Sequence, residues 1–189
     1  MFLRTKRLLL RPGWRQDGPA LHRAIADERI VRNLASAPWP YTLENAEAFL
    51  ATERKASEPS LLIFLHGNGA PELIGGIGFG RRPTGEMEFG YWLSRGNWGR
   101  GYATEAGRAL LATARHGLRV KRLDSAHFLD NPASGRVLEK LGFRPTGMIV
   151  PRFSAGRGEA APCRLFKLEL QAESEAEVEA AFTEPAMAA

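Results

Sequence analysis

Cysteine is nearly absent from the chain, since Cys163 is the only one among 189 residues. A single cysteine excludes an intrachain disulfide and suits a reducing compartment, so we expect a cytoplasmic protein. No apolar run is long enough to span a bilayer, and we expect no membrane partner. The opening MFLRTKRLLLRP lacks the small-residue cleavage site of a secretion signal, which favours a first β-strand there.

Signatures of metal and nucleic-acid binding are missing as well. The four histidines show none of the spacings typical of metal ligands, so we expect no metal cofactor: His22, His66, His116 and His127. The sequence has no run of five or six like charges and no interleaving of basic and aromatic residues. We therefore expect no nucleic-acid partner.

The charge is distributed unevenly along the chain. The formal net charge is +5, from 26 basic and 21 acidic residues. Five of the acidic residues and none of the basic ones fall in 172–189, so the rest of the chain carries +10. A basic body favours an anionic partner such as a phosphorylated cofactor, although an arginine-rich soluble surface is the other interpretation. We expect one domain over 1–171, followed by an acidic Ala/Glu-rich tail that is either disordered or a frayed helix.

Hydrophobic periodicity predicts an α+β (mixed α/β) domain. An antiparallel meander comes first, with a hairpin turn at Gly67-Asn68-Gly69, and strands and helices alternate after it. Helices are expected at 17–34, 42–56, 103–117 and 133–141, and strands at 3–11, 60–66, 72–80, 86–94, 121–128, 143–150 and 163–170.

The segment NWGRGYATEA, residues 97–106, places two glycines around Arg100 directly before an expected helix. The first turn of a helix has free N–H groups and roughly half a positive charge, and glycines let the backbone approach an anion closely. Two common phosphate loops do not fit. No Gly-Lys-Ser/Thr ending is present, and Thr104 stands where the dinucleotide fingerprint needs its third glycine. Local chemistry alone leaves both a tight turn and an anion site open.

Three segments in order resemble the GNAT N-acetyltransferases, most closely their RimJ/RimL-like branch. They are LRTKRLLLRP, FGYWLSRGNWGRGYATEAGRALL and DNPASGRVLEKLGF, and the resemblance covers roughly residues 3–170. It implies a GNAT-like, mostly antiparallel sheet of about seven strands, splayed in the middle and flanked by helices. It also implies acetyl-CoA as cosubstrate and direct acetyl transfer to a primary amine. Homodimers are common among relatives, so a homodimer is one expectation.

The resemblance implies a set of coenzyme A-binding residues. Gly101 and Ala103 occupy the last two defined positions of the family's Arg/Gln-x-x-Gly-x-Gly/Ala pattern. Trp98 replaces the first, which favours backbone N–H donors over a side chain. The pyrophosphate loop would comprise Gly99, Arg100, Gly101, Tyr102, Ala103 and Thr104. The pantetheine arm would contact Tyr91, Trp92, Leu93 and Asn131, and the adenosine phosphate would contact Arg136 or Lys140.

The resemblance also implies catalytic roles. Leu138 stands where many GNAT enzymes have a tyrosine acid, so Ser134 becomes the candidate acid. Glu88, acting through water, is the candidate base, with Glu159 as a second choice. The Leu93 N–H or its neighbour would stabilise the oxyanion. Helix-start chemistry at Asn131 and Ser134, and an outward-facing strand position for Glu88, are the structural alternatives.

The acceptor is left open by these motifs. An α-amine, with a pKa of about 7.7–8.0 against about 10.4 for lysine, needs less help from a base, so a protein N-terminus is one candidate. An aminoglycoside or polyamine is the alternative, and a non-catalytic acyl-CoA-binding sensor is a third. Cys163 has no motif around it, which favours direct transfer over an acetyl-cysteine route.

Overall fold

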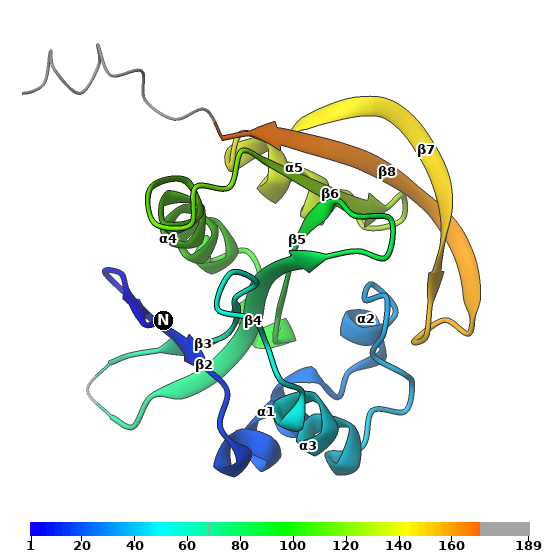
Figure 1. Ribbon diagram of the computed structural model, residues 1–189. Coiled ribbons are helices and arrows are strands. Elements are labelled where there is room, and N and C mark those ends of the chain that lie inside the picture. The colour runs from blue at the N-terminus through cyan, green and yellow to red at the C-terminus, as the bar shows by residue number, and fades with distance from the viewer. Residues whose placement is uncertain (68, 171–189) are drawn as a thin grey trace, which may run out of the picture.

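A computed structural model describes residues 1–67 and 69–170 (Figure 1). One eight-stranded sheet runs through it in the order β1-β2-β3-β4-β5-β6-β8-β7. Its strands are β1 (Leu3–Arg4), β2 (Leu8–Pro12), β3 (Ser60–Leu65), β4 (Glu72–Arg81), β5 (Met87–Leu93), β6 (Arg122–Phe128), β7 (Arg144–Ser154) and β8 (Glu159–Glu169). Its helices are α1 (Gly18–Ile25), α2 (Glu28–Val31), α3 (Leu43–Ala51), α4 (Tyr102–His116) and α5 (Pro132–Lys140), with 3₁₀ turns η1 (Arg15–Asp17) and η2 (Arg95–Asn97).

The predicted α+β fold with one mostly antiparallel sheet is confirmed, with two differences in its first third. The expected strand over 3–11 is two strands, because the Thr5 N–H donates to the Leu8 carbonyl (2.9 Å) and turns the chain between them. This turn adds the eighth strand. The expected helix over 17–34 is also divided, because Asp27 adopts an extended conformation and caps α2 by accepting from the Arg29 N–H.

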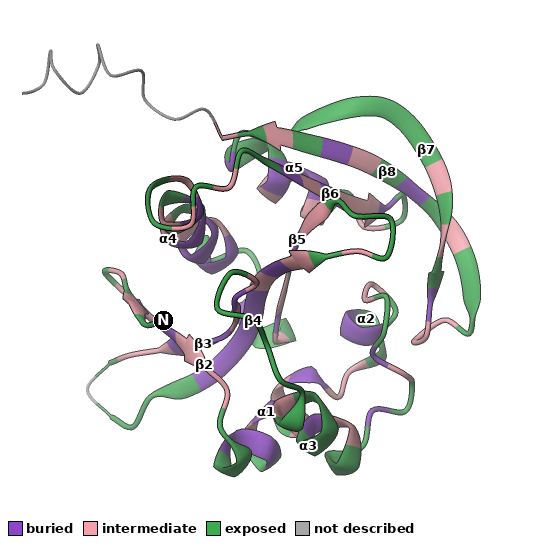
Figure 2. Ribbon diagram, in the orientation of Figure 1, coloured by how far each residue is buried: buried purple, intermediate pink, exposed green. Residues whose placement is uncertain are grey.

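The core is divided between the two faces of the sheet (Figure 2). On one face, Ala106, Leu110 and Ala114 of α4 are fully buried at helical spacing, as the sequence predicts for an amphipathic helix. On the other face, α1, α2 and α3 pack against β3 and β4. Side chains alternate along β5, so Phe89 lies in the α4 cluster and Trp92 packs against the α1–α3 cluster.

The sheet splays between β5 and β6, as predicted. These are its only parallel neighbours in the described residues, and they pair at one position, Glu88 with Asp124. The Ser125 hydroxyl, donating to the Phe89 carbonyl at 2.9 Å, holds the strands together one residue further on. On its other side, β6 pairs with β8 over its whole length. The two strands therefore separate toward their carboxyl ends, where α4 and α5 begin.

The hairpin of β7 and β8 arches away from the rest of the sheet and returns toward α2 (Figure 1). β7 is an edge strand, with exposed apolar side chains at Met148, Ile149 and Phe153. Its pairing with β8 shifts register between Pro145 and Ile149. The hairpin tip is fixed, because the Ser154 hydroxyl donates to the carbonyls of Arg32 (3.2 Å) and Leu34 (2.8 Å).

Some of the predictions made from the sequence concern residues that the structure does not describe. The middle residue of the Gly67-Asn68-Gly69 turn, the domain boundary at 171 and the tail 172–189 lie outside the described residues. Across the part of the chain that the structure describes, no helix combines the length and apolar character needed to cross a membrane.

Candidate active site

The glycine-rich loop leads from the splayed end of β5 into α4. Gly99 (φ 73°) and Gly101 (φ 80°) both adopt left-handed backbone conformations, and Gly101 is the N-cap of α4. The first intrahelical bond runs from the Glu105 N–H to the Gly101 carbonyl (3.0 Å), and no side chain caps the helix. The N–H groups of residues 102–104 are therefore free donors at the positive end of a fifteen-residue helix.

Trp98 fixes the start of this loop. Its indole Nε1–H donates to the Leu93 carbonyl (2.8 Å), the last carbonyl of β5. The buried Asn97 amide donates to the Ser94 hydroxyl (2.9 Å). Because the only donor of the Trp98 side chain is engaged within the protein, the loop offers a ligand its backbone N–H groups. Tyr102 and Ala103 are themselves buried and contribute backbone only.

An open groove runs beside the first turns of α4, lined by Thr5, Arg7, Gly101, Thr104, Glu105, Arg108, Ala109 and Lys140. Its one carboxylate, Glu105, accepts from the Thr5 hydroxyl (2.6 Å) and pairs with Arg7 (2.7 Å). Burial raises the pKa of Glu105, but hydrogen bonds from Thr5 and Arg7 outweigh burial and lower it. Arg7 also donates to the Arg100 carbonyl (3.1 Å). Arg108 and Lys140 are left to give the groove a positive charge.

The groove contains residues that the sequence did not single out. Arg7 comes from the turn between β1 and β2, and only the tertiary fold brings it to the loop. Arg108 stands one helical turn after Thr104, so the spacing could have revealed it. Lys140 lines the groove, whereas Arg136 is exposed on α5 and is not among the lining residues.

Tyr91 and Ser134 meet across the splayed strands. The Tyr91 hydroxyl lies 3.0 Å from Ser134 Oγ and 3.3 Å from the Ser134 carbonyl. Burial raises the pKa of Tyr91 to about 12, although the hydrogen bond with Ser134 acts in the opposite direction. Asn131 is the N-cap of α5 and accepts from the Ser134 N–H (3.4 Å). The structure thus brings together Tyr91, Asn131 and Ser134, three residues that the sequence analysis selected as site candidates.

Glu88 lies on the opposite face of β5 from Tyr91, near the point where the strands part. Its Oε2 accepts from Arg82 (3.0 Å) and from Arg152 of β7 (2.8 Å). Within the described residues Oε1 accepts no hydrogen bond, so it is the oxygen open to water or a ligand. Glu159 is exposed at the start of β8 and forms no ion pair with any described residue.

A comparison with known proteins identifies the family of this chain. The Acetyltransferase (GNAT) domain matches residues 7–144, which include the loop, Glu88, Tyr91 and Ser134. The chain belongs to the GNAT family. It is an acetyl-CoA-dependent acetyltransferase, and the resemblance to the GNAT family identified in the sequence is confirmed.

Relatives of this GNAT protein include two curated bacterial sequences. YoaA of Bacillus subtilis strain 168 is 27% identical over 154 residues, covering 78% of this chain and 85% of that protein. The protein p20 of Bacillus licheniformis is 26% identical over 154 residues, covering 78% and 84%. Both are named as uncharacterized N-acetyltransferases.

Solved structures share the GNAT fold. An acetyltransferase from Agrobacterium tumefaciens strain C58 has a TM-score of 0.69 at 29% identity, covering 89% of this chain and 94% of its own. RimL, a ribosomal L7/L12 α-N-protein acetyltransferase in complex with coenzyme A, has a TM-score of 0.76 at 20% identity, covering 92% and 100%. At that identity, the likeness to RimL shows a common fold.

On the α2 side of this GNAT fold, Arg157 joins the hairpin tip to two distant segments. Its Nε donates to the Arg32 carbonyl (2.7 Å), and its Nη atoms contact both carboxylate oxygens of Asp130 (2.8 and 2.9 Å). Arg32 contacts the same carboxylate (3.1 Å). These arginines lower the pKa of Asp130, the hydrogen bond from Arg157 most of all. The contact places the hairpin next to the residue that precedes Asn131.

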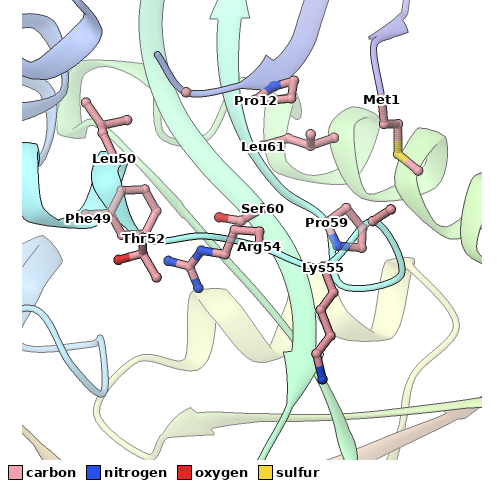
Figure 3. A pocket seen from close by; sticks show the side chains of 12 residues that line it. Met1, Pro12, Phe49, Leu50, Thr52, Arg54, Lys55, Pro59, Ser60 and Leu61 are labelled. Atoms are coloured by element: carbon pink, nitrogen blue, oxygen red, sulfur yellow. The ribbon is translucent and has the colours of Figure 1, made fainter. Parts of the chain in front are cut away.

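A second cavity lies away from this site, between the end of α3 and the adjoining strands (Figure 3). Phe49, Leu50 and Leu61 line it together with Arg54 and Lys55. It includes none of the predicted site residues. Among the described residues, no three His, Cys, Asp or Glu side chains are grouped so that they could hold a metal ion.

Proposed function

We propose that this GNAT protein transfers the acetyl group of acetyl-CoA directly to a primary α-amine, with a protein or peptide N-terminus as acceptor. The observation that carries the proposal is the loop of residues 98–104. Its two left-handed glycines and free N–H groups open onto a groove lined by Arg108 and Lys140. This is the donor set that a pyrophosphate and a further phosphate require.

The residues present fit coenzyme A. We assign the pyrophosphate to the N–H groups of residues 99–104, and the adenosine phosphate to Lys140 and Arg108, with Arg136 one turn before Lys140 on α5 and outside the groove lining. The gap between β5 and β6 would take the pantetheine arm, alongside Tyr91, Trp92, Leu93 and Asn131. Acetyl-CoA supplies an acetyl group activated as a thioester.

Acetyl transfer forms a nitrogen–carbon bond and breaks a carbon–sulfur bond, so one proton leaves the amine and one reaches the sulfur. We assign the first proton to Glu88, accepted at Oε1 directly or through water, and the second to the Ser134 hydroxyl. The Leu93 N–H or its neighbour is the proposed oxyanion donor. Leu138, at the position of the usual tyrosine, is fully buried and takes no part.

The charge around Glu88 supports an α-amine over a polycation. Four arginines gather around two carboxylates on this side of the protein, Arg82 and Arg152 at Glu88, and Arg32 and Arg157 at Asp130. A net positive surface repels an aminoglycoside or a polyamine. An α-amine is partly neutral near pH 8 and therefore suits a base that has one oxygen free.

Release of free thiol from acetyl-CoA tests the proposal. Peptides with free N-termini should release thiol in a time-dependent reaction, whereas Nα-blocked peptides carrying lysine, aminoglycosides and polyamines should release much less. Calorimetry should show binding of coenzyme A. Binding without thiol release to any amine would indicate the acyl-CoA sensor, and absence of binding would contradict the proposal as a whole.

The proposal includes three further points. Residues 1–171 form the acetyltransferase domain, so a variant ending at residue 171 should keep both coenzyme A binding and turnover.

The protein acts in the cytoplasm as a homodimer. Light scattering after size exclusion measures the mass that tests the dimer. A monomeric mass would contradict the dimer and leave the chemistry unaffected.

A further inference from the structure

The hydroxyl groups of Tyr91 and Ser134 face each other where β5 and β6 separate. The chemistry proposed above gives a role to the Ser134 hydroxyl but none to the Tyr91 hydroxyl. Tyr91 stands on β5 with its ring beside Phe89 (centroids 6.1 Å apart), and its hydroxyl reaches Ser134 in the first turn of α5. Among the described residues, Tyr91 provides the only side-chain hydrogen bond to Ser134 Oγ. This contact joins the two sides of the gap that would hold the pantetheine arm.

The hydrogen bonds between Tyr91 and Ser134 determine how this pair can act. The single hydrogen of the phenol points toward Ser134, where Oγ at 3.0 Å is the nearer acceptor and the carbonyl oxygen at 3.3 Å, which can only accept, is the more distant one. A phenol that donates to Ser134 Oγ at 3.0 Å leaves the serine hydrogen without a protein acceptor in the described residues. That hydrogen is then available to a ligand in the gap.

We propose that Tyr91 is a positioning residue for the reaction, which holds the Ser134 hydroxyl as a donor toward the sulfur of the leaving group. The inference rests on the proposed function. When the carbon–sulfur bond breaks, its electron pair stays on sulfur, and the Ser134 hydrogen stabilises the charge or passes to it. If the proton passes, the Tyr91 hydroxyl can replace it on Oγ, and water restores the phenol.

The surroundings of Tyr91 support this role. Burial raises its pKa to about 12, so the phenol keeps its hydrogen throughout the neutral range. The backbone of Ser134 is held by the Asn131 cap, so Tyr91 and Asn131 together restrain both the main chain and the side chain of the serine. A preorganised donor of this kind costs no rearrangement during the reaction.

A double-mutant cycle of Tyr91→Phe and Ser134→Ala tests the inference. We expect Ser134→Ala to lower kcat about 100-fold, in the range of a lost acid, and Tyr91→Phe about tenfold. The double variant should be about as slow as Ser134→Ala, because Tyr91 acts through Ser134. The Kd of coenzyme A from calorimetry should change less than about twofold in each, since the loss belongs to the transition state.

A second readout does not depend on turnover. The ionisation of bound coenzyme A can be followed by the ultraviolet absorbance of its thiolate. A hydroxyl donor favours the charged form, so the pKa of the bound thiol should be higher in both single variants than in the unaltered protein. A purely structural role for Tyr91 would leave this pKa where it was.

Tyr41→Phe is the control, because Tyr41 is a buried tyrosine whose hydroxyl makes no hydrogen bond to the described residues, whereas Tyr91 is half-buried. Ser134→Thr keeps a hydroxyl and should retain most of the rate. Equal losses from Tyr91→Phe with and without Ser134, or an unchanged rate and thiol pKa in Tyr91→Phe, would overturn the inference while the proposed function stands. An unaltered protein that releases no thiol would overturn both.

Discussion

The proposed donor side and the proposed acceptor side of this GNAT domain are built differently. The phosphate-binding part of the donor side comes mainly from one continuous stretch, since β5, the glycine loop and α4 follow one another from Met87 to His116, and α5 adds Lys140. The acceptor side is assembled from four separate segments, which meet through the ion pairs of Glu88, Asp130 and their arginines. The donor side depends on backbone conformation. The acceptor side depends on side chains that are distant in sequence, such as Arg152 and Glu88, which are 64 residues apart.

This difference predicts how the two sides respond to change. A backbone site is sensitive at glycine positions and insensitive to most side chains, whereas an ion-pair network is sensitive at each arginine and carboxylate. Substitutions on the donor side should therefore alter coenzyme A binding, and those on the acceptor side should alter use of the amine.

The largest effect is expected at Gly101. Gly101→Asp places a carboxylate beside the free N–H groups of α4 and forces a side chain into a backbone with φ 80°. Coenzyme A binding by calorimetry should weaken by about 100-fold or more, as like charges meet at close range. Gly147→Asp introduces the same side chain at another left-handed glycine (φ 84°) with open surroundings, so this variant should bind coenzyme A normally. Equal loss in both variants would show that strain alone is responsible.

Glu88→Gln comes next and should act only on the acceptor side. The variant keeps the shape of the side chain and loses its proton acceptor, so kcat with a peptide amine should fall by about 100-fold. The Kd of coenzyme A should be unchanged. Glu86→Gln, two residues earlier and exposed, is the control and should behave like the unaltered protein. A rate that survives in Glu88→Gln would transfer the role of base to another group.

Arg157→Ala should have a smaller effect, divided between stability and acceptor use. The variant removes two contacts to Asp130 and one to the Arg32 carbonyl from an arginine side chain that is only 9% exposed. We expect the free energy of unfolding to fall by about 2 kcal/mol, and KM for the peptide to rise about fivefold. Arg157→Lys should recover only part of the lost stability, since lysine cannot contact both carboxylate oxygens of Asp130 as the guanidinium does. An unchanged denaturation midpoint would show that the contacts of Ser154 and Ala155 hold the hairpin tip without Arg157.

The smallest effect is expected at Arg7. Arg7→Gln leaves the Glu105 carboxylate uncompensated in the groove and removes the contact to the Arg100 carbonyl. Coenzyme A should bind about threefold more weakly, and the difference should shrink at high salt, because the pair is partly exposed. Lys6→Gln, an exposed neighbour, controls for the loss of charge. Equal weakening in both variants would mean that only total charge matters.

The same contrast explains what the sequence could predict. The glycine loop and the α5 cap depend on residues close together in the chain, so their types and spacing were informative, whereas the splay was expected only from the family resemblance. The Tyr91–Ser134 contact spans 43 residues and the Arg152–Glu88 pair 64, and no local pattern reports such pairs. The turn at Thr5 was missed for a different reason, because its hydrogen bonds with Leu8 are local but LRTKRLLLRP has the residue pattern of one continuous strand.

The outer strand β7 has a consequence for the association of this protein with other chains. An unpaired edge with Met148, Ile149 and Phe153 exposed would normally invite another sheet to continue the hydrogen-bond ladder. Pro145 and Pro151 have no N–H to donate, and the left-handed Gly147 lies where the register shifts. A neighbouring strand would therefore meet a ladder with missing donors, so β7 can expose apolar side chains without serving as a template for aggregation.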